Sequence, residues 1–434
     1  MSGFLSPLTL FRDPSVAPLF ISRIVSSASV GFGQLALAWG VMDLGYGARG
    51  LSLVMACNAF PALLIICGGV AGDRFRRHYV LMGAETLACL SWLAIGAALF
   101  TGRAPLALLC VLAAVGGVAT ALFLPTLRGI IADLLDSPNR PRRNALINQT
   151  QSIGLLIGLV SSGAMVTAVG PAWSASMRGV LCGLSVVLLS RLATSRPSEP
   201  GTGPLRDLRN GWREFGARPW VWIMTLQYTA ITTAVVCYTK IAGPLYATDG
   251  HGGAWSWGII SACEPLGAVM GALVGARWRP GWPMSAAALL PVSVAFPMLL
   301  MGSGAPWPLI AAAAVVPGVL QAVYYVLWAT ALQERIALDV LVRVNSWNMV
   351  ASYLLMPLIM LVSGRLATIL GAEALAFWSG TTAIIATLYA LIWLRFIAWR
   401  ENPSEIETKR LWRKQTSSAS SEEAGSDIGS NTQP

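Results

Sequence analysis

Long runs of apolar residues alternate with short polar or charged stretches along almost the whole chain. Apolar runs of about 18 or more residues with few charges are typical of helices that cross a membrane. We therefore predict an all-α membrane protein in which every connection lies at a membrane surface. The pattern places twelve spans at residues 17–44, 51–72, 79–101, 105–134, 146–169, 172–192, 220–247, 253–277, 284–303, 306–334, 345–370 and 374–398.

Composition supports this prediction. Of the 434 residues, 55% are hydrophobic and only 12% are charged, whereas soluble domains usually carry about a quarter charged residues. The seven cysteines lie inside the predicted spans without the spacing of metal ligands, so we interpret them as small apolar residues and expect neither a metal nor a cofactor. Residues 1–14 contain Arg12 and Asp13 and lack an apolar core, so we expect no cleavable signal peptide.

The basic residues are distributed unevenly. The net charge is +10, which by itself is compatible with nucleic-acid binding. However, all but six of the 30 lysines and arginines lie on, or at the border of, one side of the predicted membrane. By the positive-inside rule this places both termini in the cytoplasm, so the charge predicts topology and no nucleic-acid partner. The six exceptions are Arg49, Arg103, Arg128, Arg178, Lys240 and Arg365.

The spans fall into two groups of six with a polar segment between them. We predict a cytoplasmic N-terminus (1–16), a six-helix half (17–192), a cytoplasmic linker (193–219), a second six-helix half (220–398) and a disordered cytoplasmic tail (399–434). Within the linker, apolar residues fall on one helical face, which favours an amphipathic helix at the inner membrane surface over an ordinary solvated linker. These residues are Leu205, Leu208, Trp212 and Phe215.

An internal repeat relates the two groups. Arg142-Arg143-Asn144 before the fifth span returns as Arg343-Val344-Asn345 before the eleventh, and Gly163 returns as Gly364. Parallel repeats of this kind indicate two pseudo-symmetric halves related by an axis along the membrane normal.

The connection between the second and third spans carries a dense motif, Gly69-x-x-x-Asp73-Arg74-x-x-Arg77. In spacing and position it resembles the loop signature of major facilitator superfamily transporters. The resemblance implies the major facilitator fold and alternating access. It also implies a cytoplasmic gate latch, in which Asp73 meets the start of the eleventh span and Arg77 pairs with an acid at the end of the fourth. The latch residues are Gly69, Asp73, Arg74, Arg77 and either Asp133 or Asp136.

Charged residues inside spans are the main functional candidates. Glu264 lies near the middle of the eighth span, where a carboxyl group prefers to be neutral unless a cation or water faces it. We interpret it as the proton carrier, with a permanently paired structural acid as the alternative and Lys240 as a candidate partner. Glu85 and Arg23 lie within about two turns of the cytoplasmic surface, so for both we expect snorkelling to water.

In the resembled family the first, fourth, seventh and tenth spans line the cavity. In this chain those spans offer amide, aromatic and a few charged side chains, a set that suits an amphipathic, drug-sized cargo. Some of these residues could instead face lipid or neighbouring helices. The candidates are Gln34, Trp39, Arg128, Gln227, Tyr228, Tyr238, Lys240, Tyr324, Tyr325 and Trp328.

A last motif bears on direction. Gly154-x-x-x-Gly158 followed by Gly163 partly resembles the exporter signature of the fifth span, although close helix packing through small residues explains it equally well. The resemblance to the superfamily covers residues 12–400, and within it the chain looks most like the twelve-span drug, macrolide and siderophore efflux branch. The segment from Leu332 to Asn345 and the linker from Leu205 to Pro219 carry this closer match. The implied function is export of an amphipathic small molecule driven by protons, by a monomer in the bacterial plasma membrane. Uptake, lipid or metabolite transport and a non-transporting sensor remain alternatives, whereas no catalytic cluster indicates an enzyme.

Overall fold

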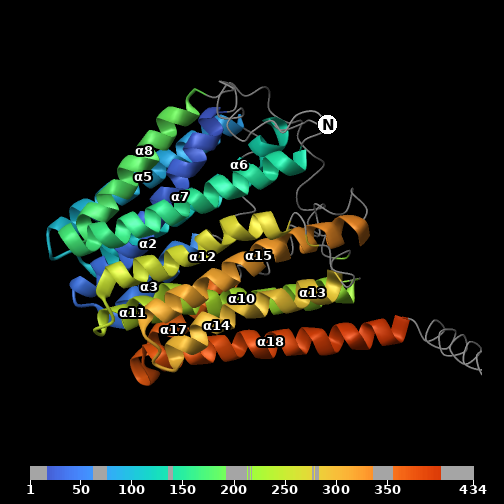
Figure 1. Ribbon diagram of the computed structural model, residues 1–434. Coiled ribbons are helices and arrows are strands. Elements are labelled where there is room, and N and C mark those ends of the chain that lie inside the picture. Colours follow the sequence, from blue (N-terminus) through green and yellow to red (C-terminus); the bar gives the residue numbers. More distant parts are fainter. Residues whose placement is uncertain are drawn as a thin grey trace, which may run out of the picture.

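The computed structural model describes residues 17–61, 76–134, 140–191, 218–275, 283–335 and 355–401, together with the isolated positions 213, 216 and 278. Within these ranges every regular element is a helix (Figure 1). The predicted linker helix, most of the predicted tail and most of the predicted latch lie outside the described residues.

The described helices form twelve successive segments. Ten of them agree with the predicted spans to within a few residues at each end, whereas α3 ends at Ala59 and α17 begins at Met356, and the rest of those two predicted spans lies largely outside the described residues. The prediction of an all-α membrane protein is confirmed. Nine stretches in the described part are long and apolar enough to cross a membrane. The segments are α2 (Ala17–Asp43), α3 (Gly47–Ala59), α5 (Arg77–Phe100), α6 (Leu106–Leu134), α7 (Arg140–Val169), α8 (Pro171–Leu189), α10 (Pro219–Cys237) continued by η2 (Tyr238–Ala242) and α11 (Gly243–Thr248), α12 (Gly253–Gly275), α13 (Pro283–Leu289) continued by η3 (Leu290–Val294) and α14 (Ala295–Gly302), α15 (Trp307–Arg335), α17 (Met356–Leu370) and α18 (Ala372–Glu401).

The outer faces of these helices are as apolar as the inner ones. On α17 and α18, for example, Ile369, Ile385 and Ile392 are each more than 60% exposed. A helix that is hydrophobic all round is stable only where both faces avoid water, as in a membrane. The surface of the bundle therefore matches a lipid environment.

The two ends of the bundle differ in their connections. At one end, here called the Asp43 end, the connections from α2 to α3, α5 to α6, α7 to α8, α11 to α12, α14 to α15 and α17 to α18 are one to five residues long. The opposite end, where α5 begins, is called the Arg77 end. Gly170 and Gly371 are the single-residue connections, and both have positive φ (95° and 87°). They are 201 positions apart, like Gly163 and Gly364, so the internal repeat extends to the backbone geometry of the turns.

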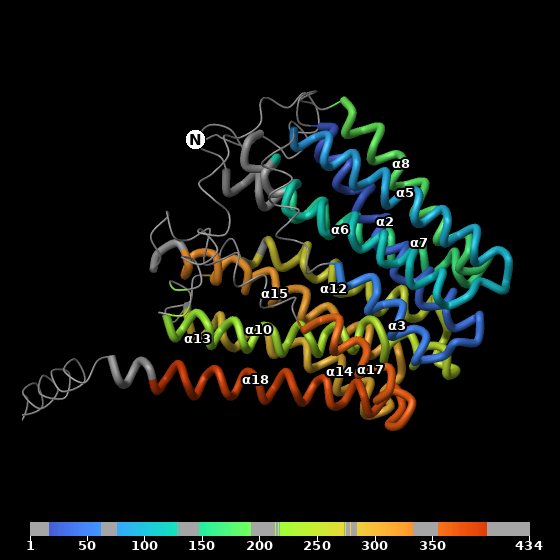
Figure 2. The backbone as a smooth tube through the Cα atoms, turned by 180° about the vertical axis from the view of Figure 1, so that it is seen from behind, coloured from blue at the N-terminus to red at the C-terminus, as the bar shows by residue number. Residues whose placement is uncertain are grey.

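The two halves lie side by side, with α2, α5, α6, α7 and α8 above α12, α15, α10 and α18 in Figure 1 and the same arrangement seen from behind in Figure 2, while α3 extends to α17 of the other half. Within the halves, α2 packs on α7 and α8, α5 on α8, and α12 on α15. Between the halves, α7 packs on α12 and α3 on α17.

Two equivalent glycines bring the halves into contact at the Asp43 end. Gly163 of α7 lies against the backbone of Ala254 and Gly258 of α12, and Gly364 of α17 lies against Ser52 of α3. Each glycine faces the other half, and the absence of a side chain permits a close approach of the helices. The bundle is thus packed together at this end.

Gly154 and Gly158 have a different role from Gly163. Both lie against carbonyl oxygens of α2, those of Ile24 and Ala28 respectively, where a Cβ atom would make hard contact. The two glycines therefore let α7 pack closely on α2 within one half. This position favours the packing interpretation of the motif.

We expect Gly158→Val to destabilise the protein, because the added methyl groups must separate α7 from α2. Overpacking of this kind costs about 1–3 kcal/mol or more, which should lower the midpoint of thermal unfolding in detergent and the yield of folded protein. Gly83→Val is the matched control, because an added Cβ at Gly83 of α5 meets nothing within 4 Å. Equal stability of the two variants would contradict the packing role.

Candidate transport site

Lys240 links the two halves in the part of the bundle nearer the Asp43 end, eight residues before the end of the seventh span at Thr248. It lies on η2, a π-helical turn of five residues that interrupts the seventh span between α10 and α11. Its Nζ atom donates a hydrogen bond of 2.7 Å to Oε1 of Gln34 on α2. Single π turns inside α-helices occur often at functional sites, since the additional residue redirects the side chains around it. The sequence predicted both residues as cavity candidates, and the structure brings them together.

Glu264 lies on α12 near Lys240. The two side chains interact electrostatically. Glu264 is partly buried and lines a cavity of about 30 Å³. Pro265 follows it within the same helix. The cavity is lined by Val235, Tyr238, Thr239, Trp257, Ile260, Ser261, Glu264, Val294, Pro297, Met298, Ala314 and Pro317.

A second buried charge pair lies in the N-terminal half. The Arg178 guanidinium of α8 lies over the Trp92 ring of α5, 3.8 Å from its centroid, and interacts electrostatically with Glu85. Ser185 donates a hydrogen bond of 3.2 Å to Glu85 Oε1. Glu85 is 4% exposed, so the prediction that it snorkels to water is wrong. The reason is that α8 packs along α5 and supplies the hydroxyl group and the cation that a buried carboxylate requires.

Arg23 is also buried, against prediction. It is 9% exposed, and its guanidinium donates a hydrogen bond to Oε1 of Gln151 on α7. Because α7 packs closely on α2 through its glycines, a polar partner is available inside the half and the side chain has no need to reach water.

Aromatic side chains bridge α10 and α15 on the Arg77 side of Glu264. The hydroxyl groups of Tyr228 and Tyr325 are 2.8 Å apart, and the rings of Tyr228 and Tyr324 are stacked with centroids 5.6 Å apart. Trp328 is buried and makes an edge contact with Trp220 at 6.0 Å. Tyr325 is 52% exposed, whereas Tyr324 is 3% exposed, so the open part of the cluster is the ring of Tyr325 beside Tyr228.

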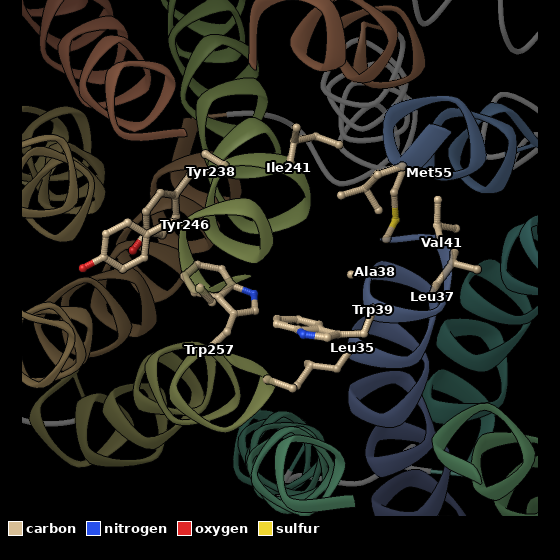
Figure 3. Close-up of a cluster of buried hydrophobic side chains, with 14 of the residues drawn as sticks. Leu35, Leu37, Ala38, Trp39, Val41, Met55, Tyr238, Ile241, Tyr246 and Trp257 are labelled. Carbon is tan, nitrogen blue, oxygen red and sulfur yellow. The ribbon is translucent and has the colours of Figure 1, made fainter. Parts of the chain in front are cut away.

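Three other predicted cavity residues are buried in the protein. Trp39 and Tyr238 belong to the largest apolar cluster, shown in Figure 3. Gln227 donates hydrogen bonds to the carbonyl of Ala288 (2.6 Å) and to Oγ1 of Thr387 (3.2 Å). Its amide group thus joins α10 to α13 and α18, which favours a structural role.

The predicted latch is only partly within the described residues. Arg77 is the first residue of α5, and Asp133 lies in the last turn of α6. The side chains of Asp133 and Arg128 are not among the described ones, and Gly69, Asp73, Arg74 and Asp136 lie outside the described ranges. The latch therefore stays a prediction.

Arg178 and the serine and cysteine residues of α8 that face Glu85 were not predicted as functional residues. A signal was present, since Arg178 is a cation in the middle of an apolar run and such residues face the protein interior. The small polar residues Cys182 and Ser185 follow it at helical spacing on the face that meets α5.

A bundle of two similar six-helix halves, with charged and polar side chains inside its spans, is typical of multi-pass membrane transporters of the secondary-carrier class. Comparison with known proteins agrees. The sequence profile of the Major Facilitator Superfamily matches residues 19–359, so this chain belongs to that superfamily. It is a transporter and not an enzyme.

Individual relatives are distant. The Enterobactin exporter EntS of Citrobacter koseri is 24% identical over 287 residues, which is 64% of this chain and 68% of that protein. Two crystal structures of the nucleoside transporter NupG, one of them of a mutant, cover 87% of this chain and 98% of theirs, with TM-scores of 0.68 and 0.70. Their sequences are 10% and 11% identical to this chain, so this similarity concerns the fold.

Proposed function

We propose that this protein exports an amphipathic small molecule, of the siderophore or drug class, in exchange for protons by alternating access. It acts as a monomer in the bacterial plasma membrane, with both termini and the Arg77 end in the cytoplasm. The relationship to an enterobactin exporter supports export. The distribution of arginine and lysine supports the orientation.

The observation that carries the proposal is the hydrogen bond between Lys240 and Gln34. It joins the two halves while they are packed together at the Asp43 end, and it lies within the electrostatic influence of Glu264. An intramembrane carboxyl group beside a cation that bridges the halves is a means of coupling protonation to the choice between two conformations.

The direction of coupling follows from charge. A negative Glu264 attracts the Lys240 ammonium away from Gln34 and favours opening of the Asp43 end. A proton that binds Glu264 from outside removes this competitor, so Lys240 binds Gln34 and the Asp43 end closes. Release of the proton to the cytoplasm reverses the preference. Protons thus move inward as cargo moves outward.

The aromatic surface of Tyr228 and Tyr325, with the buried ring of Tyr324 stacked on Tyr228 behind it, is our candidate for cargo binding. Aromatic rings with hydroxyl groups offer apolar area together with hydrogen bonds, as amphipathic ligands require. The latch around Asp73 and Arg77 would close the Arg77 end in the alternate conformation.

Inverted membrane vesicles that contain the protein test this function. With an acidic lumen, we expect them to accumulate enterobactin or members of a panel of amphipathic antibiotics at least several-fold over vesicles without the protein. A protonophore should remove the accumulation. Accumulation only in right-side-out vesicles would indicate uptake and contradict export. Specific binding of these compounds without their movement in either orientation would indicate a sensor.

A further inference from the structure

We propose that the cavity beside Glu264 is a binding site for one small monovalent cation, a hydrated proton or Na⁺, separate from the surface that binds cargo. This inference rests on the proposed function, because it assigns the place where the coupling ion is held.

The cavity lies entirely within the C-terminal half. Its described lining residues come from the seventh, eighth, ninth and tenth spans. Its volume of about 30 Å³ accommodates about two water molecules or one small ion. Drug-sized ligands occupy pockets of roughly 300 Å³ or more, so cargo is excluded from it by size.

Two hydroxyl groups of the lining residues lack partners. Tyr238 is 5% exposed, and its hydroxyl oxygen is buried without a hydrogen bond to any described residue; the same holds for Oγ of Ser261. Buried hydroxyl groups are rarely left without a partner, because the loss of solvation is costly. No described side chain or backbone group donates a hydrogen bond to the Glu264 carboxylate either. Together these groups supply oxygen ligands for a small bound species.

The backbone adds a further oxygen atom. Pro265 has no N–H group to donate to the carbonyl of Ser261. Ser261 lines the cavity. Helix carbonyls freed in this way are typical ligands of Na⁺ or of a proton-carrying water in transporters.

The charge of the site fits one monovalent cation. Glu264 supplies a single negative charge, and the titratable side chains whose electrostatic influence reaches it in the described part of the chain are Lys240 and Tyr238. The Lys240 ammonium is held by Gln34, which leaves the carboxylate available. In Figure 3 the indole nitrogen of Trp257 is on the side of Trp39, away from Tyr238 and Tyr246.

Thermal unfolding of the purified protein tests the site. A ligand that binds the folded state raises the unfolding midpoint, so Na⁺ is titrated against choline at fixed pH, and pH is varied separately at fixed Na⁺. We expect one of the two cations to stabilise the wild type and to have no such effect on Glu264→Gln. Ser261→Ala and Tyr238→Phe should each raise the half-saturating cation concentration by about two- to ten-fold, since each removes one oxygen ligand.

Thr229→Val is the control, because it removes a buried hydroxyl group of α10 that bonds within its own helix and does not line the cavity. A response to Na⁺ identifies sodium as the ligand, and a response to pH alone that is lost in Glu264→Gln identifies the proton. Either supports the site. The proposal is overturned if neither cation distinguishes wild type from Glu264→Gln, or if Ser261→Ala and Tyr238→Phe both respond as the wild type does.

Cargo counterflow, measured in the same preparations, distinguishes failure of the proposed cation site from failure of the proposed function. Absence of counterflow in the wild type would contradict transport, whereas the cation response is measured without cargo. Ser261→Ala, the smaller change, preserves a readout if Tyr238→Phe fails to fold.

Discussion

Replacement of Glu264 by glutamine is expected to abolish uphill transport while cargo exchange continues. The amide resembles the protonated carboxyl group in shape and neutrality but cannot release a proton. Because an isolated charge at this depth is unfavourable by about 3 kcal/mol, the neutral variant should fold normally. Reconstituted protein should lose at least about ten-fold in accumulation driven by a pH gradient and retain counterflow without one.

Glu264→Asp serves as the control, since it keeps a carboxyl group and should keep part of the uphill activity. If Glu264→Gln still concentrates cargo when the gradient is applied, the proton carrier lies elsewhere. Glu85 and Asp43 are then the next carboxyl groups to replace.

Lys240→Met is expected to weaken closure at the Asp43 end. The substitution keeps much of the side-chain volume but removes the hydrogen bond to Gln34. A hydrogen bond that involves a charged group contributes about 1.5–3 kcal/mol, so the population open at this end should rise about ten-fold or more. A cysteine at position 52, where Ser52 is 3% exposed and packed against Gly364, reports the change through an impermeant thiol reagent in a background without the native cysteines.

Gln34→Leu provides the matching half of a double-mutant cycle. If the two residues act through their mutual hydrogen bond, the double variant should label no faster than the more affected single variant. Fully additive effects, or labelling equal to that of wild type in Lys240→Met, would show that the bond does not hold the halves together.

The apolar pattern predicted the helices well because every span that crosses the hydrocarbon core must be a long run of apolar residues. Glu264 and Lys240 were identifiable for the same reason, since a charge within such a run is conspicuous. Their relation was not predictable. Lys240 reaches Gln34 from a π turn, and nothing in a local apolar run indicates where a helix takes on an additional residue.

The rotation of each helix about its own axis was the main feature that the sequence did not predict. Glu85 was expected at the surface because its distance from the helix start suggested it. Its actual position depends on which face of α5 meets α8, and that is decided by contacts between residues a hundred positions apart, such as Ser185 with Glu85. Gly158 likewise acquires its role only from the carbonyl of Ala28 on a neighbouring helix.

The single-residue connections at Gly170 and Gly371 restrict how the bundle can rearrange. A connection of one residue has no slack, so the ends of α7 and α8 at Gly170, and those of α17 and α18 at Gly371, must stay together. Opening of the Asp43 end therefore cannot begin with separation of these joined helix ends. The joined ends have to move together, so α7 and α8 leave α12 at Gly163 as one step, and α17 and α18 leave α3 at Gly364 as another.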